Sequence, residues 1–128
     1  MESADALSFQ KPVFVPPNTT IREVASLMNR LGVDYVLIKE GSKVVGIFTE
    51  RDVVKAISMG ATPDSLVVDY ASKDLLTASK DEPLTSIASK MIENNIRHMP
   101  IVDASGNILG VVNIKDVLRM VLAFGSWP

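Results

Sequence analysis

The sequence contains no cysteine, so it can form no disulfide, thiolate metal site or thiol nucleophile. Net charge is also small, because 13 basic and 15 acidic residues sum to −2 with the single histidine neutral. This balance provides no broad positive field for nucleic acid. Residues 1–10 lack the basic start and apolar run of a secretory signal, and Arg119 interrupts even the apolar run at 117–124. We therefore expect a cytoplasmic protein that neither spans a membrane nor holds a metal ion.

An internal repeat is the main feature that the sequence does contain. The segment GIFTERD at 46–52 recurs in outline as GVVNIKD at 110–116, which is 64 residues later. Upstream, 21–28 matches 84–91 at an offset of 63. The one extra residue fits a hairpin turn, where 41–43 becomes 104–107, because such loops tolerate insertions. With 128 residues, the two copies are expected to share one compact module.

Each copy predicts a short strand, a helix, a hairpin of two strands and a second helix. Apolar residues at helical spacing, such as Ile21, Val24 and Met28, predict the core face of the first helix. Thr20 with Glu23 is typical of a capping box, and Pro83 is expected in the first turn of the matching helix. The predicted strands are 13–15, 36–38, 44–48, 76–78, 100–102 and 108–112, and the closing helices are 50–59 and 114–122.

The predicted fold class is α/β of the α+β kind, with two β-α-β-β-α repeats and a three-stranded sheet in each. Such a small sheet cannot cover both of its faces alone, so the repeats are expected to pack around a pseudo-twofold axis with clefts between equivalent edges. The expected divisions are an N-terminal segment (1–10), a first repeat (11–60), an ordered connector (61–72), a second repeat (73–122) and a tail (123–128).

The GIFTERD segment and the segment IRHMPIVD at 96–103 resemble the cystathionine-β-synthase (CBS) domain family. The resemblance covers both repeats, from about residue 11 to about residue 121. It implies a regulatory module without catalytic activity, which binds AMP, ADP, ATP or S-adenosylmethionine between its repeats and acts on a partner protein that the sequence does not identify. It also implies a homodimer formed through helix faces, with no cofactor beyond the regulatory ligand.

The family pattern of glycine, Thr or Ser, and Asp maps onto Gly46, Thr49 and Asp52. In similar modules these positions face the first strand and the start of the hairpin of the other repeat, which implies a main cleft. There, Asp52 could accept the ribose hydroxyls, while cationic side chains and free amides at a helix start would suit phosphate. The residues implied for the main cleft are Ile47, Thr49, Arg51, Asp52, Thr77, Ala78, Ser79, Lys80, Ile96, Arg97, His98 and Pro100.

A second cleft departs from the pattern, because Asn113 replaces the hydroxyl residue and Asp34 stands where Arg97 stands in the main cleft. Tyr35 or Phe14 could stack on a purine, but Asp34 would repel an anion. We expect this cleft to bind a nucleoside-like ligand weakly, or nothing. The residues implied for it are Asn113, Lys115, Asp116, Phe14, Val15 and Tyr35.

Other interpretations of these residues stay open. Thr49 with Asp52 could be a capping pair that satisfies helix amides without any ligand. His98 could be an ordinary structural side chain or a phosphotransfer site, although no converging nucleophile, base and orienting group supports an enzyme. The module could also be a structural dimerisation unit with decayed clefts. Trp127 is expected either to pack on the module or to lie in a subunit contact.

Overall fold

The computed structural model describes residues 11–123. The predicted N-terminal segment and Trp127 lie outside these residues. The described chain divides into two compact units, which we call the first repeat unit (Val13–Leu75) and the second repeat unit (residues 76–123 with residues 11–12).

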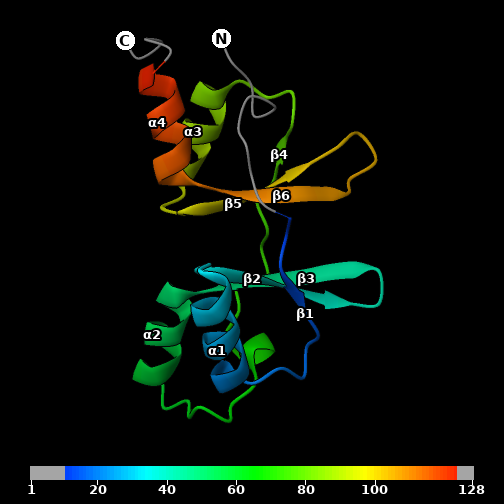
Figure 1. Cartoon of the computed structure of the whole chain (residues 1–128), viewed down its shortest axis with the longest axis vertical. Coiled ribbons are helices and arrows are strands. Elements are labelled where there is room, and N and C mark those ends of the chain that lie inside the picture. The colour runs from blue at the N-terminus through cyan, green and yellow to red at the C-terminus, as the bar shows by residue number, and fades with distance from the viewer. Residues whose placement is uncertain (1–10, 124–128) are drawn as a thin grey trace. The chain divides into compact units, whose positions relative to one another are not determined.

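The first repeat unit has the predicted order of strand, helix, hairpin and helix (Figure 1). Its β1 pairs with β2 in parallel, and β2 pairs with β3 antiparallel, in one three-stranded sheet. The elements are β1 (Phe14–Val15), α1 (Ile21–Leu31), β2 (Tyr35–Glu40), β3 (Lys43–Thr49), α2 (Glu50–Ser58) and a 3-10 turn (Val67–Asp69).

The second repeat unit follows the same plan, with a mixed sheet of order β4-β5-β6. In both hairpins the pairing register shifts at the equivalent place, after Ile38 and after Ile101. The predicted α+β class with a three-stranded sheet in each repeat is therefore confirmed. The elements are β4 (Ala78–Ser79), α3 (Leu84–Glu93), β5 (His98–Val102), β6 (Ile108–Asn113) and α4 (Ile114–Ala123).

Two local predictions in the second repeat were wrong. The strand expected at 76–78 lies at Ala78–Ser79, because only these two residues are in register with β5, opposite Ile101 and Val102. Pro83 does not lie in the first turn of α3 but directly before it, since its ψ of 142° is extended. Its carbonyl nevertheless accepts the first bonds of the helix, from the amides of Ser86 and Ile87.

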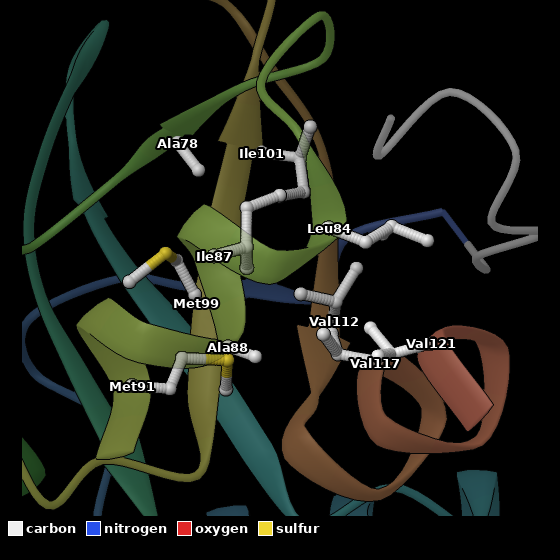
Figure 2. Close-up of a cluster of buried hydrophobic side chains, with 10 residues drawn as sticks. All are labelled: Ala78, Leu84, Ile87, Ala88, Met91, Met99, Ile101, Val112, Val117 and Val121. Carbon is white, nitrogen blue, oxygen red and sulfur yellow. The ribbon is translucent and has the colours of Figure 1, made fainter. Parts of the chain in front are cut away.

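Both helices of each repeat unit lie on one face of its sheet (Figure 1). Strand side chains alternate between faces, so every second residue points towards the helices. The first core contains Val15, Ile21, Val24, Met28, Val36, Ile38, Phe48, Ala56 and Val67. Figure 2 shows the second core, which contains Ala78, Leu84, Ile87, Ala88, Met91, Met99, Ile101, Val112, Val117 and Val121. Each repeat therefore buries a core of its own.

The connector that follows α2 is hydrogen-bonded to other parts of the first repeat unit. Ile47 of β3 and Ser72 exchange two backbone hydrogen bonds of 2.9 and 3.0 Å. At the start of α1, the amide of Ile21 donates to the Ser65 carbonyl at 2.9 Å. Gly46 makes the close approach possible, because a Cβ at this position would lie 3.0 Å from the Ser72 carbonyl oxygen. The connector is thus paired with β3 at the edge of the first sheet and is held in place there.

Candidate functional site

Several predicted site residues lie on the sheet face that carries no helix. Because Phe48 belongs to the helix-side core, its neighbours Ile47 and Thr49 point to the opposite face. Tyr35 lies directly across from Thr49 and shares that face. In the second repeat unit, His98 is paired with Asn113 at the equivalent position. The fold therefore places the two sets of residues at corresponding points of the two sheets.

A hydrogen-bonded pair marks the start of α2. The backbone N–H and the hydroxyl of Thr49 both donate to Oδ2 of Asp52, at 2.9 and 3.3 Å. Among the described residues, no donor contacts the other carboxylate oxygen, Oδ1. Both side chains are half-buried. The pair acts as a helix cap and also orients the carboxylate, so capping and ligand binding are compatible roles.

Two of the amides at this helix start are used within the protein. The Glu50 amide donates to the Asp34 carbonyl at 3.1 Å, and the Thr49 amide is held by Asp52. These bonds arise because the chain segment that leads into β2 runs beside the end of β3. These two amides are therefore not available to a phosphate near Thr49.

The start of α4, the equivalent position in the second repeat unit, is capped differently. Oδ1 of Asn113 accepts the Lys115 amide at 2.8 Å, which caps α4 without any help from Asp116. Asp116 instead pairs with Arg119 one turn later at 3.1 Å, and both side chains are exposed. The second repeat unit thus lacks a carboxylate that is oriented by its capping residue.

At the start of the second repeat, the predicted site residues lie on β4 and beside it, including the turn that follows. Thr77 and Ser79 are exposed, whereas the side chain of Ala78 is buried in the second core. Only the backbone of Ala78 is left for a ligand. Lys80 is half-buried, and its amide donates to the Val102 carbonyl at 3.1 Å, which ties this turn to β5.

The start of β5 carries the predicted cationic residues. Arg97 lies at a bend just before the strand and is exposed, while its carbonyl accepts the Ile114 amide at 2.9 Å. His98 begins the strand and is half-buried. Since Arg97 precedes the strand, strand alternation does not force these two side chains to opposite faces. Ile96 packs on the second core, Pro100 is buried, and Arg51 of α2 is exposed.

The aromatic residues predicted for the second cleft have contacts within their own repeat. Tyr35 is only 7% exposed, and its hydroxyl accepts the Val13 amide at 3.3 Å. Burial raises the pKa of the Tyr35 phenol against the effect of that hydrogen bond, and the charge of Asp34 adds to the rise. Lys39 lies over the Phe14 ring at 4.8 Å, and Val15 is in the first core. The buried ring of Tyr35 offers little surface for stacking.

A carboxylate that the sequence interpretation missed lies beside β4. Glu82 accepts hydrogen bonds from Ser86 and Lys90 of α3 and from the Ser79 amide. Burial raises the pKa of Glu82, but these bonds and the charge of Lys90 outweigh burial and lower it overall. The spacing Ser79-x-x-Glu82 is a capping-box signal that could have indicated the contact.

Within residues 11–123, no three His, Asp or Glu side chains gather in a way that could hold a metal ion. The helices in this part of the chain are also too short or too polar to cross a membrane.

The fold and these residues define a class of protein, the tandem-repeat α+β modules in which each repeat joins a three-stranded sheet to a capped helix. The sequence pattern of the CBS domain family matches residues 5–59 and 67–123. The chain therefore belongs to the CBS domain family and carries two tandem copies, as the sequence motifs predicted.

Known proteins similar to this chain include relatives and solved structures of the same family. A 17.7 kDa protein of Acidianus ambivalens is 40% identical over 88% of this chain, and the chain spans 68% of that protein. A CBS domain protein of Pyrobaculum aerophilum, solved in complex with AMP, has a TM-score of 0.86 at 26% identity, covering 98% of this chain and 100% of that one. The CBS domain pair of protein MJ0100, solved with 5-methylthioadenosine and S-adenosyl-L-methionine, has a TM-score of 0.84 at 26% identity, covering 98% and 97%.

The chain spans 55% of a second curated relative, a protein of Methanopyrus kandleri that is 34% identical over 81% of this chain.

Proposed function

We propose that this chain is a regulatory module that binds an adenine nucleotide, AMP, ADP or ATP, in one main cleft between its two repeats. The observation that carries the proposal is the Thr49–Asp52 pair, in which the hydroxyl residue holds one carboxylate oxygen and leaves the other to accept from a ligand. An oriented carboxylate is well suited to the paired hydroxyls of a ribose, because charge-assisted hydrogen bonds are the stronger ones. The AMP complex of the Pyrobaculum aerophilum relative supports the same ligand class.

In this proposal, the other half of the main cleft comes from the second repeat unit. Arg97 and Lys80 provide the positive charge for phosphate, and His98 provides a further polar contact. Thr77, Ser79 and the backbone of Ala78 line the cleft beside β4, and Ile47 provides an apolar contact for the base. The remaining members proposed for this cleft are Arg51, Ile96 and Pro100.

The second cleft is proposed to bind weakly or not at all. Asp116 is paired with Arg119, Tyr35 is buried with its hydroxyl on Val13, and Asp34 adds a negative charge. These contacts support one occupied site per chain. Ligand binding would then favour one arrangement of the repeats over another and change how the module contacts a partner protein, without catalysing a reaction. We place this role in the cytoplasm, where adenine nucleotides are abundant.

We also propose that two copies associate through their helices. Helix α2 exposes Val54 (71%) and Ile57 (52%), which lie three residues apart on one side of the helix. Leu122 of α4 is 64% exposed. Covering such apolar side chains favours association. Sedimentation equilibrium should give the mass of a dimer, and a Val54→Glu substitution should shift it towards the mass of one chain.

Isothermal titration tests the proposed ligand directly. Purified protein should bind AMP, ADP or ATP, and Asp52→Ala should weaken that binding. S-adenosylmethionine is the alternative ligand, favoured by the MJ0100 complex, and titration of that compound separates the two classes. A structural dimerisation module with decayed clefts would bind none of these compounds, and its melting temperature would not rise when they are added.

A further inference from the structure

Glu82 holds two elements of the second repeat unit together, the turn after β4 and the helix α3. Its Oε2 accepts the Ser86 hydroxyl at 2.8 Å and contacts the Lys90 ammonium at 2.8 Å. Its Oε1 lies 3.0 Å from the same Lys90 nitrogen. The Glu82 side chain is 17% exposed and that of Lys90 is 40% exposed. The carboxylate is thus fixed from the helix side by contacts with two residues, Ser86 and Lys90.

The opposite side of the carboxylate faces the backbone of the turn. Oε1 of Glu82 accepts the Ser79 amide at 3.4 Å, and the Glu82 amide donates to the Ser79 carbonyl at 3.0 Å. The Ser79 hydroxyl accepts the Asp81 amide at 3.2 Å, which closes the turn further. Lys80 lies inside this closed turn. Its position therefore depends on the bonds between Ser79 and Glu82.

The first repeat unit builds the equivalent turn without this network. At the offset of 63 residues, Pro16, Thr19 and Leu27 stand in place of Ser79, Glu82 and Lys90. Pro16 has no amide hydrogen to donate, and the Thr19 hydroxyl simply donates to the Pro16 carbonyl at 2.7 Å. The repeat fold therefore forms without an acid and a base at these positions. The network occurs in the repeat that supplies the β4 side of the proposed main cleft.

We propose that Glu82 is a positioning residue of the main cleft: anchored on Ser86 and Lys90, it holds the backbone at Ser79 and Lys80 where the ligand contacts it. This inference rests on the proposed function, since it assigns Glu82 a role at the same site. Glu82 itself does not touch the ligand. The pKa of Glu82 is lowered from its ordinary value, so the carboxylate stays charged, and its contact with Lys90 is kept, to more acidic pH.

Amide hydrogen exchange of the ligand-free protein tests the positioning without relying on any ligand. In Glu82→Ala, the amides of Ser79 and Lys80 should exchange about tenfold faster than in the wild type, because local opening becomes easier when the carboxylate is gone. Glu93→Ala is the matched control, since Glu93 is an exposed acid at the end of α3, the helix that Glu82 contacts. Unchanged exchange at Ser79 and Lys80 in Glu82→Ala would overturn the inference.

Titration with AMP, ADP, ATP and S-adenosylmethionine tests the consequence for binding. The compound that binds the wild type should bind Glu82→Ala about tenfold more weakly, because a tenfold change corresponds to the loss of one modest contact. Glu82→Gln keeps the size of the side chain and an acceptor for the Ser79 amide, so it should recover part of the affinity. The affinity of Glu93→Gln should lie within about twofold of the wild-type affinity, because a change of that size is too small to reflect a lost contact.

These experiments distinguish failure of the proposed function from failure of the role assigned to Glu82. If the wild type binds none of the four compounds, the proposed function fails and the assigned role of Glu82 fails with it. If the wild type binds one compound, and Glu82→Ala and Glu82→Gln melt at lower temperature but bind it as tightly as the wild type, Glu82 is only structural. In that case the inference is wrong and the proposed function stands.

Discussion

The two repeat units share one fold but differ at the start of the helix that follows the hairpin. In the first, Thr49 holds the carboxylate of Asp52, and the carboxylate is oriented by two hydrogen bonds. In the second, Asn113 caps the helix alone, and Asp116 pairs with Arg119 on the exposed side. The aspartate is thus present twice in the sequence but is oriented by its capping residue only once.

The cores of the two repeats also differ at one equivalent position, and this difference gives the largest expected effect. Phe48 is fully buried in the first core, where the second core has Val112. Phe48→Ala should cost about 3–5 kcal/mol, because it removes a large buried ring and leaves a cavity. Val112→Ala should cost only about 2 kcal/mol. Urea unfolding measures both, and equal losses would contradict the described packing.

The connector distinguishes the first repeat unit further, because Ser72 pairs with β3 there. Gly46→Val should destabilise the protein by about 1–3 kcal/mol, since its side chain would meet the Ser72 backbone. Ser72→Ala keeps both backbone bonds and should cost less than about 0.5 kcal/mol. Thermal unfolding compares the two variants. A Gly46→Val protein as stable as the wild type would show that the connector is not held on β3.

The next comparison concerns the two aspartates and ligand affinity. Asp52→Ala should weaken binding of the adenine nucleotide at least about tenfold, because a charge-assisted bond to the ribose is lost. Asp116→Ala should leave the affinity within about twofold, since the proposal gives it no role in the occupied cleft. Titration calorimetry on both variants measures the difference. Equal effects of the two substitutions would remove the distinction between the clefts.

The smallest expected effect concerns Glu82 and pH. The folded pKa of Glu82 lies below its ordinary value of 4.5, so its contribution to stability is present above that value and is lost as pH falls through the folded pKa. The size should be about 1 kcal/mol or less, because Lys90 is 40% exposed and solvent screens the pair.

The measurement for Glu82 is urea unfolding of the wild type and of Glu82→Gln between about pH 3 and about pH 7. The wild type should be the more stable protein at the upper end, and the difference should shrink towards the acidic end. Thr19 occupies the equivalent position in the first repeat unit and contributes nothing to this pH dependence. A difference that grows as pH falls would contradict the sign of the pKa shift.

The sequence alone predicted much of the fold, because the repeat and its apolar periodicity are local signals. The helix beginning at Ile21 and both hairpins follow from residues within a few positions of one another. The strand predicted at 76–78 lies at Ala78–Ser79 in the structure, because a two-residue strand is defined by its register with β5 and not by its own composition. The pairing of Ser72 with Ile47 was missed for the same reason, since it joins residues that are distant along the chain.

The sequence could indicate candidate residues for a site but not the contacts that these residues make. The motif indicated Thr49 and Asp52, yet it could not indicate that the Glu50 amide is taken by the Asp34 carbonyl. The sequence allowed either Tyr35 or Phe14 to stack on a purine, but it could not indicate that the Tyr35 hydroxyl accepts the Val13 amide. Such contacts depend on where strands end relative to one another, which no pattern of residue types encodes.

One titration tests the central claim most directly, that two similar repeats form a single working site. Wild-type protein titrated with AMP, and in parallel with ADP and ATP, should bind one nucleotide per chain, and Asp52→Ala should weaken this binding while Asp116→Ala should not. Absence of binding at millimolar nucleotide, or two equivalent sites per chain, would contradict the account.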